Sequence, residues 1–185
     1  MSDLLAAEPE IPTASLKAGD SAAWDALARR WDGPLRSYLY RLSGDMNEAD
    51  ELASETMVRA WKARDSITGG KISTWLFAIA TNLFRNRRRW WRRRLKWLAG
   101  YEEEFPEARD PSPAPDDVAL RDERAARVKR AVLALPEELR EPLVLATYEE
   151  KSHIEIGAIL GITPKAVERR IARARDRLRE KLVGV

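Results

Sequence analysis

The residues best suited to chemistry in this sequence are basic and aromatic ones gathered between positions 85 and 97, in the segment RNRRRWWRRRLKW. The segment holds seven Arg and one Lys, and no acidic residue occurs between positions 66 and 101. Three consecutive Arg side chains cannot all point one way from a helix, so their charges surround it and repel one another. A polyanion relieves that repulsion, because each neutralised phosphate releases a condensed counterion, and Trp rings stack on bases. The segment therefore predicts contact with nucleic acid.

Two other interpretations of the Arg-rich segment are open. A stripe that repeats every seven residues runs through it, made of Leu76, Leu83, Trp90 and Trp97. Residues seven apart lie close to one face of a helix, so Trp90 is predicted to be buried in the core rather than free to stack. An anionic membrane surface would also attract the arginines, but the acidic residues that follow oppose that partner. No apolar run approaches about 20 residues, so no membrane insertion is expected.

A second pattern that favours nucleic acid lies in residues 152–179. A short helix is expected near Ser152–Leu160, with Gly161 at the tight turn that follows. Thr163 is suited to cap a second helix, and Pro164 to occupy its first position. Basic residues lie outside the apolar stripe of that second helix, as in a helix–turn–helix that places its second helix in the major groove of DNA. An ordinary helical hairpin with a basic exterior is the alternative.

Residue types that carry catalysis or bind metals are scarce. The sequence has no Cys and a single His, His153, which disfavours thiolate zinc sites, cysteine nucleophiles and Ser–His hydrolases. His153 is predicted to lie at the surface, and Glu102–Glu104 to be solvated, because consecutive acids in a proline-rich segment diverge. We therefore predict no catalytic residue, no metal and no cofactor, and no enzymatic activity. The start, MSDLLAAEPEIP, lacks the features of a signal peptide, so a cytoplasmic location is expected.

Helices are the elements expected to position these residues. Apolar residues recur at helical spacing, and no period-two alternation bounded by hairpin signals occurs, so the fold class is predicted to be all-α. An apolar stripe from Trp24 to Leu42 is expected to break near Gly33-Pro34. Asn47 is the expected cap of the next helix, and Ser73 that of a long third helix.

Charge and proline content divide the chain. The net charge is −4 over residues 1–65, +9 over 66–101, −6 over 102–124 and +4 over 125–185, which makes +3 in total. Residues 100–117 hold four of the ten prolines, which remove the backbone donors that a helix needs. We predict two small helical domains joined by a flexible linker. Their predicted ranges are a tail at 1–15, a first domain at 16–98, an acidic proline-rich linker at 99–120 and a second domain at 121–185.

Taken together, these features resemble an extracytoplasmic-function (ECF) sigma factor, a promoter-specificity subunit of bacterial RNA polymerase. LKAGDSAAWDALARRW and GPLRSYLYRLSGDMNEADELASETMVRAW resemble the opening helices of sigma region two, and STWLFAIATNLFRNRRR resembles its helix for the minus-ten element. LPEELREPLVLATYEEKSHIEIGAILGITPKAVERRIARARDRLRE resembles region four. The resemblance covers roughly residues 16–97 and 121–182. It implies core RNA polymerase, promoter DNA and an anti-sigma factor as partners.

The resemblance also implies roles at individual positions. It places contact with the clamp coiled coil of the largest polymerase subunit at Asp50, Glu51, Ser54, Glu55 and Arg59, and contact of region four with the polymerase flap. It places minus-ten DNA binding at Ile67, Thr68, Lys71, Ser73, Thr74, Trp75, Asn82, Arg85, Arg87 and Arg88, with capture of a flipped base near Asn82. It places minus-thirty-five recognition at Lys165, Glu168, Arg169, Arg170 and Arg173. Ser54 stands where Gln is usual in the family, which implies a weaker polymerase contact there. Glu168 and Arg169 stand where a basic residue and Ser are common, so the family's minus-thirty-five preference does not transfer.

A stand-alone helix–turn–helix regulator is the main alternative. It would use the first half as a sensor or dimerisation domain and bind palindromic sites as a dimer. The basic helix in the first half argues against it, because a sensor domain does not need one. A nuclease is a more distant alternative, since no clustered carboxylates accompany the basic surface as two-metal chemistry requires.

Overall fold

The computed structural model describes residues 11–67, 70–99 and 118–182. Over these ranges the chain forms eight α-helices and one 3₁₀ turn, without a β-strand, so the all-α prediction is confirmed. The helices are α1 (Thr13–Ala18), α2 (Ser21–Ser43), α3 (Met46–Lys62), α4 (Ile72–Ala99), α5 (Val118–Leu133), α6 (Glu137–Thr147), α7 (His153–Leu160) and α8 (Pro164–Leu182), and the 3₁₀ turn is Arg64–Ser66. Residues 100–117 of the predicted linker lie outside the described residues.

Helix α2 continues through Gly33-Pro34, so the predicted break is wrong. Proline removes one helical hydrogen bond and crowds the preceding turn. However, Leu27 and Leu35 on either side of it are fully buried. Packing of the apolar stripe therefore keeps the helix continuous, since tertiary contacts supply most of a helix's stability.

Two of the predicted helix caps are also wrong. Asp45, and not Asn47, caps α3: its backbone is extended, and its side chain accepts a hydrogen bond from the N–H of Glu48 at 3.0 Å. Asn47 already lies in the first turn. Helix α4 begins one residue before Ser73, whose buried hydroxyl instead accepts a hydrogen bond from Nζ of Lys151 at 2.9 Å.

The core of the first half fixes the N-terminal part of α4 against α2. Tyr38, Phe77 and Phe84 are fully buried there. The Tyr38 hydroxyl forms a hydrogen bond with that of Thr81 at 2.8 Å, and the rings of Tyr38 and Phe77 meet edge to face at 5.1 Å. The α4 residues that make these contacts lie between positions 72 and 84, so this part of α4 is fixed to the core.

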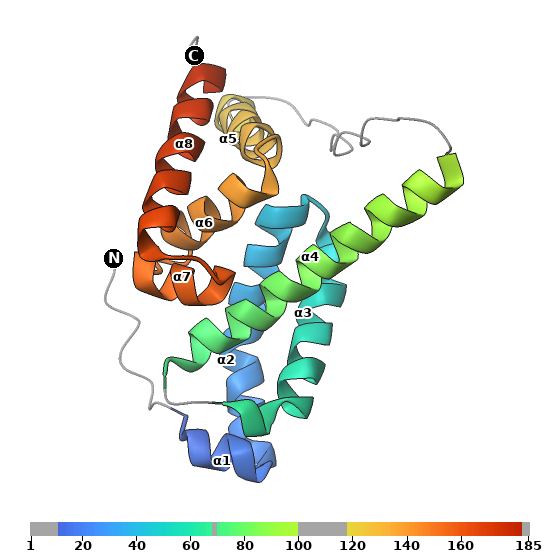
Figure 1. The fold of residues 1–185 in the computed structure, drawn as a ribbon, viewed down its shortest axis with the longest axis vertical. Coiled ribbons are helices and arrows are strands. Elements are labelled where there is room, and N and C mark those ends of the chain that lie inside the picture. The colour runs from blue at the N-terminus through green and yellow to red at the C-terminus, as the bar shows by residue number, and fades with distance from the viewer. Residues whose placement is uncertain (1–10, 68–69, 100–117, 183–185) are drawn as a thin grey trace.

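The distal part of α4 leaves that core. Leu76 and Leu83 are 0% and 4% exposed, whereas Trp90 and Trp97 are 47% and 84% exposed. Figure 1 shows α4 running to the upper right past the other helices. The predicted burial of Trp90 is therefore wrong, because the seven-residue stripe continues beyond the helices that cover it.

The second half contains the predicted helix–turn–helix, formed by α7 and α8. Ser152 and Glu155 form a reciprocal capping box at the start of α7. Gly161 ends α7 with a positive φ of 69°, which glycine adopts without strain. The Thr163 hydroxyl accepts a hydrogen bond from the N–H of Ala166 at 3.2 Å, as predicted for a cap. The axis of α7 crosses that of α8 steeply (Figure 1).

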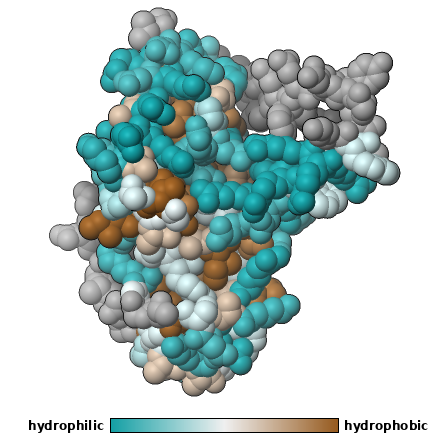
Figure 2. All heavy atoms as spheres, in the orientation of Figure 1, coloured by the Kyte–Doolittle hydropathy of each residue, from teal (hydrophilic) through white to brown (hydrophobic). Residues whose placement is uncertain are grey.

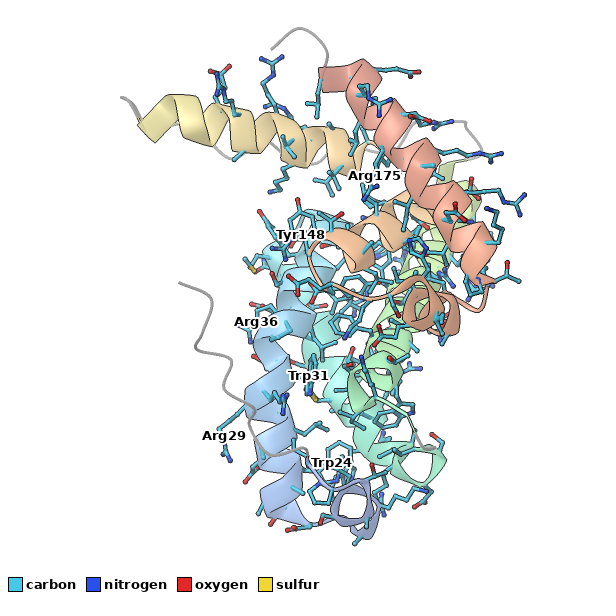
Figure 3. All side chains as sticks on the ribbon, turned by 90° about the vertical axis from the view of Figure 1, so that its left-hand side faces the viewer. Trp24, Arg29, Trp31, Arg36, Tyr148 and Arg175 are labelled. Atoms are coloured by element: carbon cyan, nitrogen blue, oxygen red, sulfur yellow. The ribbon has the colours of Figure 1, made fainter. Side chains whose placement is uncertain are left out.

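The two halves contact each other along α4 and α2. Helix α7 packs against α4, and α5 and α6 pack against α2. In Figure 3 the second half lies above the first, with Tyr148 at the junction and Trp31 below it. The face of α4 that meets α7 is the one on which the sequence places several DNA-binding residues.

Candidate nucleic-acid interface

One face of α4 carries residues predicted to bind minus-ten DNA. Lys71, Trp75, Asn82 and Arg85 are separated by four, seven and three residues, so they lie on the same side of the helix. Lys71 and Asn82 are exposed, whereas Trp75, Thr74 and Arg85 are half-buried and Ile67 and Ser73 are buried. Thr68 lies outside the described residues. The structure therefore brings most of this predicted set together around the start and one side of α4.

Arg85 is held by a carboxylate of the second half. Its Nη2 and Nε lie 2.6 and 2.9 Å from the two carboxylate oxygens of Glu141, on α6. The Glu141 side chain is only 2% exposed, and the Arg85 side chain 29%. Burial raises the pKa of Glu141, whereas hydrogen bonding to Glu141 raises the pKa of Arg85. This paired geometry is the one in which a guanidinium otherwise binds a phosphate.

The start of α4 is engaged in a similar way by the loop and helix around residues 151–155. Nζ of Lys71 lies 3.0 Å from a Glu155 carboxylate oxygen, and Nζ of Lys151 donates to the Ser73 hydroxyl at 2.9 Å. Burial lowers the pKa of Lys151. Hydrogen bonds from Ser152, and then the Lys71 contact, lower the pKa of Glu155 to about 2. Lys71 and Ser73, which are predicted to bind minus-ten DNA, thus contact the second half here.

Arg87 and Arg88 face the first half instead. Nη1 of Arg87 lies 2.7 Å from a Glu51 carboxylate oxygen, and its Nη2 lies 3.6 Å from one of Glu55. Nη2 of Arg88 donates to the carbonyl oxygen of Ser43 at 3.4 Å, and its guanidinium lies over the Phe84 ring. Both arginines therefore help to hold α4 on α2 and α3.

An acidic face of α3 gathers the residues predicted to dock onto polymerase. Glu51, Glu55 and Arg59 lie four residues apart on one side of the helix, with Ser54 beside them. Glu55 and Arg59 form an ion pair at 2.9 Å. Asp50 contacts Arg36 of α2 at 3.1 Å. The predicted docking residues thus form one patch, and its exposed members are available to a partner.

Helix α8 presents the residues predicted to recognise minus-thirty-five DNA. Val167, Ile171 and Ala174 are buried on its inner face. Its outer face holds the predicted set, of which Lys165, Glu168, Arg169 and Arg173 are exposed and Arg170 is half-buried. Lys165 contacts Glu168 at 2.8 Å and lowers the pKa of that carboxyl. Figure 2 shows hydrophilic residues over the upper part of the molecule that includes α8.

The structure adds two residues to this region that were not predicted from the sequence. Glu141 and Lys151 contact α4 residues that are 56 and 78 positions away in the chain. Their side-chain types alone do not distinguish them from solvated charges. His153 is exposed, as predicted. Within the described ranges no three His, Cys, Asp or Glu side chains gather as a metal ion requires, and no helix there is long and apolar enough to cross a membrane.

Comparison with protein families identifies the class to which this fold and surface belong. Residues 27–94 match Sigma-70 region 2, and residues 125–178 match Sigma-70 region 4. The chain is 32% identical over 175 residues to the ECF RNA polymerase sigma factor SigW of Bacillus subtilis, covering 90% of this chain and 92% of SigW. It is 37% identical over 169 residues to SigE of Mycolicibacterium smegmatis, covering 89% of this chain but only 64% of SigE. The chain belongs to the ECF sigma factors of the sigma-70 family, the promoter-specificity subunits of RNA polymerase.

Solved structures agree with that assignment. The sigma factor RpoE in its complex with the anti-sigma factor NepR from Bartonella quintana has a TM-score of 0.70 and 26% identity, covering 88% of this chain and 98% of RpoE. CnrH in complex with the cytosolic domain of CnrY has a TM-score of 0.69 and 26% identity, covering 92% of this chain and 94% of CnrH. The main alternative, a stand-alone helix–turn–helix regulator, is not favoured.

Proposed function

We propose that this chain brings core RNA polymerase to promoters by dividing the work among three surfaces. The acidic face of α3 docks onto the clamp coiled coil of the largest subunit, and the second half contacts the flap. Helix α4 binds the minus-ten element, with Asn82 contacting a base flipped from the melted strand. The outer face of α8 recognises the minus-thirty-five duplex from the major groove. The chain needs no catalytic group or cofactor for this, because the polymerase performs the chemistry, and it acts in the cytoplasm with that enzyme.

The main support for the proposal is that one chain contains two helices suited to different forms of DNA, α8 and α4. Helix α8 has a buried stripe and a basic outer face, which suits insertion into a groove. Helix α4 combines the exposed amide of Asn82 with flanking cations. An amide can form hydrogen bonds with the exposed edge of an unpaired base, which a duplex-binding helix does not require.

On this proposal, α4 can bind DNA only after its contacts with the second half are released. Lys71, Ser73 and Arg85 contact α6, α7 or the loop before α7. A DNA strand cannot reach those atoms while the contacts persist. The two halves therefore separate when the chain binds polymerase and promoter, and the carboxylates of Glu141 and Glu155 are replaced by phosphates.

We extend the proposal to an anti-sigma factor, as found in the complex of RpoE with NepR. A largely apolar hollow of about 620 Å³ lies between α2 and α5. Its lining includes Tyr40, Val128, Val132 and Tyr148. Since both halves contribute to it, a helix seated there would stabilise the arrangement in which α4 is covered.

Transcription with purified core polymerase tests the proposal. We expect the protein to direct specific run-off transcripts from members of a broad promoter library, and a failure both to bind core and to start transcripts would refute it. Asn82→Ala is expected to prevent promoter opening, followed by permanganate reactivity of unpaired thymines, while core binding stays intact. Asp25→Ala, on an exposed part of α2, is the control. Loss of core binding by Asn82→Ala would mean that α4 is misassigned.

A further inference from the structure

The distal part of α4, residues 89–97, which we call the arm, is a surface that the proposed function does not use. Trp90, Trp91 and Trp97 are 47%, 46% and 84% exposed. Large aromatic side chains contribute most to stability or to binding when they are buried. Three exposed Trp side chains on one short segment therefore indicate an interaction surface. In Figure 1 the end of α4 extends away from the helices of both halves, and the base of the arm keeps one contact with α6, through Arg92 and Glu137. The rest of the arm is therefore accessible while the start of α4 is covered.

The arm also holds three cations that no described carboxylate contacts, whereas a fourth, Arg92, pairs with Glu137 of α6 at 2.6 Å. Arg85 and Arg87 are paired with glutamates, as described above. No carboxylate of the described residues contacts Arg89, Arg93 or Arg94: the first donates to the Asn86 side chain, the second to a backbone carbonyl, and the third lies 5.2 Å from the centre of the Trp90 ring. Neighbouring guanidinium groups repel one another, and an anion from another molecule relieves that repulsion.

Arg89 and Arg93 line an open hollow of about 760 Å³ together with Asn86, Trp90 and Arg92. Residues 86, 89, 90 and 93 share one helix face, because each lies three or four positions from two of the others. The Trp90 and Trp91 rings meet edge to face at 4.8 Å, which steadies the exposed Trp90 ring. Guanidinium groups bind phosphate oxygens, and an indole face stacks on a base of any sequence. The hollow offers both on one surface.

A bilayer surface fits the arm less well. Helices that lie in a membrane interface have a continuous apolar face and a separate charged face. Here Arg93 and Arg94 lie between Trp90 and Trp97, which are on one side of the helix because seven residues separate them. Insertion of that side into lipid would bury arginines, whereas a nucleic acid strand accepts cations and rings side by side.

We propose that the arm is a nucleic-acid-binding surface of the free protein, and that it acts without polymerase and without a promoter sequence. Arg89, Arg93 and Arg94 bind the phosphodiester backbone, and Trp90 stacks on a base where the strand is single. The inference goes beyond promoter recognition, because it assigns a DNA contact outside the predicted minus-ten and minus-thirty-five residues. It rests on the proposed function only for the choice of DNA as the polyanion.

The test uses the full-length protein alone and a labelled 20-nucleotide DNA of non-promoter sequence, single-stranded in one arm and duplex in the other. Fluorescence anisotropy gives the affinity over a range of salt concentrations. We expect a Kd between about 1 and 100 µM near physiological salt for at least one of the two forms, weakening steeply as salt rises. A preference for the single strand would assign a stacking role to Trp90. Equal binding to both forms would mean that the arm contacts only the phosphodiester backbone.

The decisive variant is Arg89→Gln, Arg93→Gln and Arg94→Gln combined. Losing three phosphate contacts should lower the slope of log K against log salt by about two for a single strand and nearly three for a duplex. The control removes three exposed cations elsewhere, Lys17→Gln, Arg29→Gln and Lys62→Gln, with the same change in net charge. Figure 3 shows Arg29 pointing away from α2. The control should retain the wild-type slope, and equal loss in both variants would reduce the effect to net charge and overturn the proposal.

Two further outcomes also overturn it. No binding to either DNA form is one, and binding to anionic phosphatidylserine vesicles with none to DNA is the other, since that would make lipid the partner. Trp90→Ala should weaken single-strand binding by about tenfold, because one stacked base is lost. Run-off transcription by the holoenzyme from the promoter library is a separate readout. Wild-type protein that binds DNA but starts no transcripts would refute the proposed function and leave the arm intact.

Discussion

The ion pair between Arg85 and Glu141 is expected to hold the two halves together. Glu141→Gln keeps the size of the side chain but removes its charge and one of the two acceptor oxygens. The pair makes close contacts at 2.6 and 2.9 Å, and the carboxylate is almost fully buried. Removing one partner of a fully buried pair costs about 3–5 kcal/mol. Arg85 is 29% exposed, so water partly solvates the guanidinium that is left.

Two effects thus lower that figure for Glu141→Gln. The remaining guanidinium is partly hydrated, and the neutral amide avoids the burial cost that raises the pKa of Glu141. A hydrogen bond to a charged group is worth about 1.5–3 kcal/mol. We expect a loss of about 2 kcal/mol in the free energy that favours the closed arrangement of the two halves. That corresponds to a shift of roughly 30-fold toward separated halves.

Energy transfer between two labels measures this separation directly. The chain has no Cys, so Lys62→Cys on α3 and Arg177→Cys on α8 give a unique labelled pair at exposed positions. Glu141→Gln should reduce the transfer efficiency, and the exposed Glu180→Gln on α8 should not.

A double-mutant cycle with Arg85→Gln isolates the pair. The coupling between Arg85→Gln and Glu141→Gln is expected to be at least 1 kcal/mol, because the two groups contact each other directly. Additive effects within about 0.5 kcal/mol would refute the conclusion that this ion pair joins the halves.

Two other predictions concern the helix–turn–helix. A Cβ at Gly157 would lie 2.7 Å from the carbonyl oxygen of Ile162, whereas one at Gly33 meets nothing within 4 Å. Gly157→Ala should therefore lower the free energy of unfolding by about 1–3 kcal/mol, and Gly33→Ala should raise it by up to about 1 kcal/mol; equal thermal stabilities would contradict this. The pKa of Glu155 lies near 2, below its ordinary value of 4.5, so its ionised form stabilises the fold above pH 4.5 and that contribution is lost as the pH falls toward 2. Urea unfolding should show a weaker pH dependence for Glu155→Gln over this range, and parallel curves for the two proteins would speak against the Lys71 and Ser152 contacts.

Features set by neighbouring residues could be predicted from the sequence. The turn between α7 and α8 depends on Gly161, Thr163 and Pro164, which are close together in the chain, and all three have the predicted roles. The predicted cap Asn47 was wrong although it was local, because Asp45 two residues earlier has the extended backbone that a cap requires. Several polar residues in a row leave the first turn ambiguous.

Features set by distant residues could not be predicted. Periodicity indicates that Leu83 and Trp90 share a helix face, but it does not tell whether another helix covers that face, and here only Leu83 is covered. The partner of Arg85 lies 56 positions away. Nothing in the run of arginines distinguishes Arg85 from Arg89, because only the folded chain brings Glu141 to one and not to the other.

The difference between the paired Arg85 and the unpaired Arg89 determines how much of the basic segment 66–101 is available to DNA. Residues 66–101 carry a net charge of +9 in the sequence, yet the charge of Arg85 is compensated by Glu141 and that of Arg87 by Glu51. DNA must compete with a buried carboxylate for Arg85, whereas no carboxylate of the described chain competes for Arg93 or Arg94. If the arm binds nucleic acid as proposed, it therefore makes contact before the rest of α4 does. On the proposed function, contacts of Arg85 with the promoter would follow only after α6 has moved away, so the ion pair would delay minus-ten binding without preventing the protein from reaching DNA.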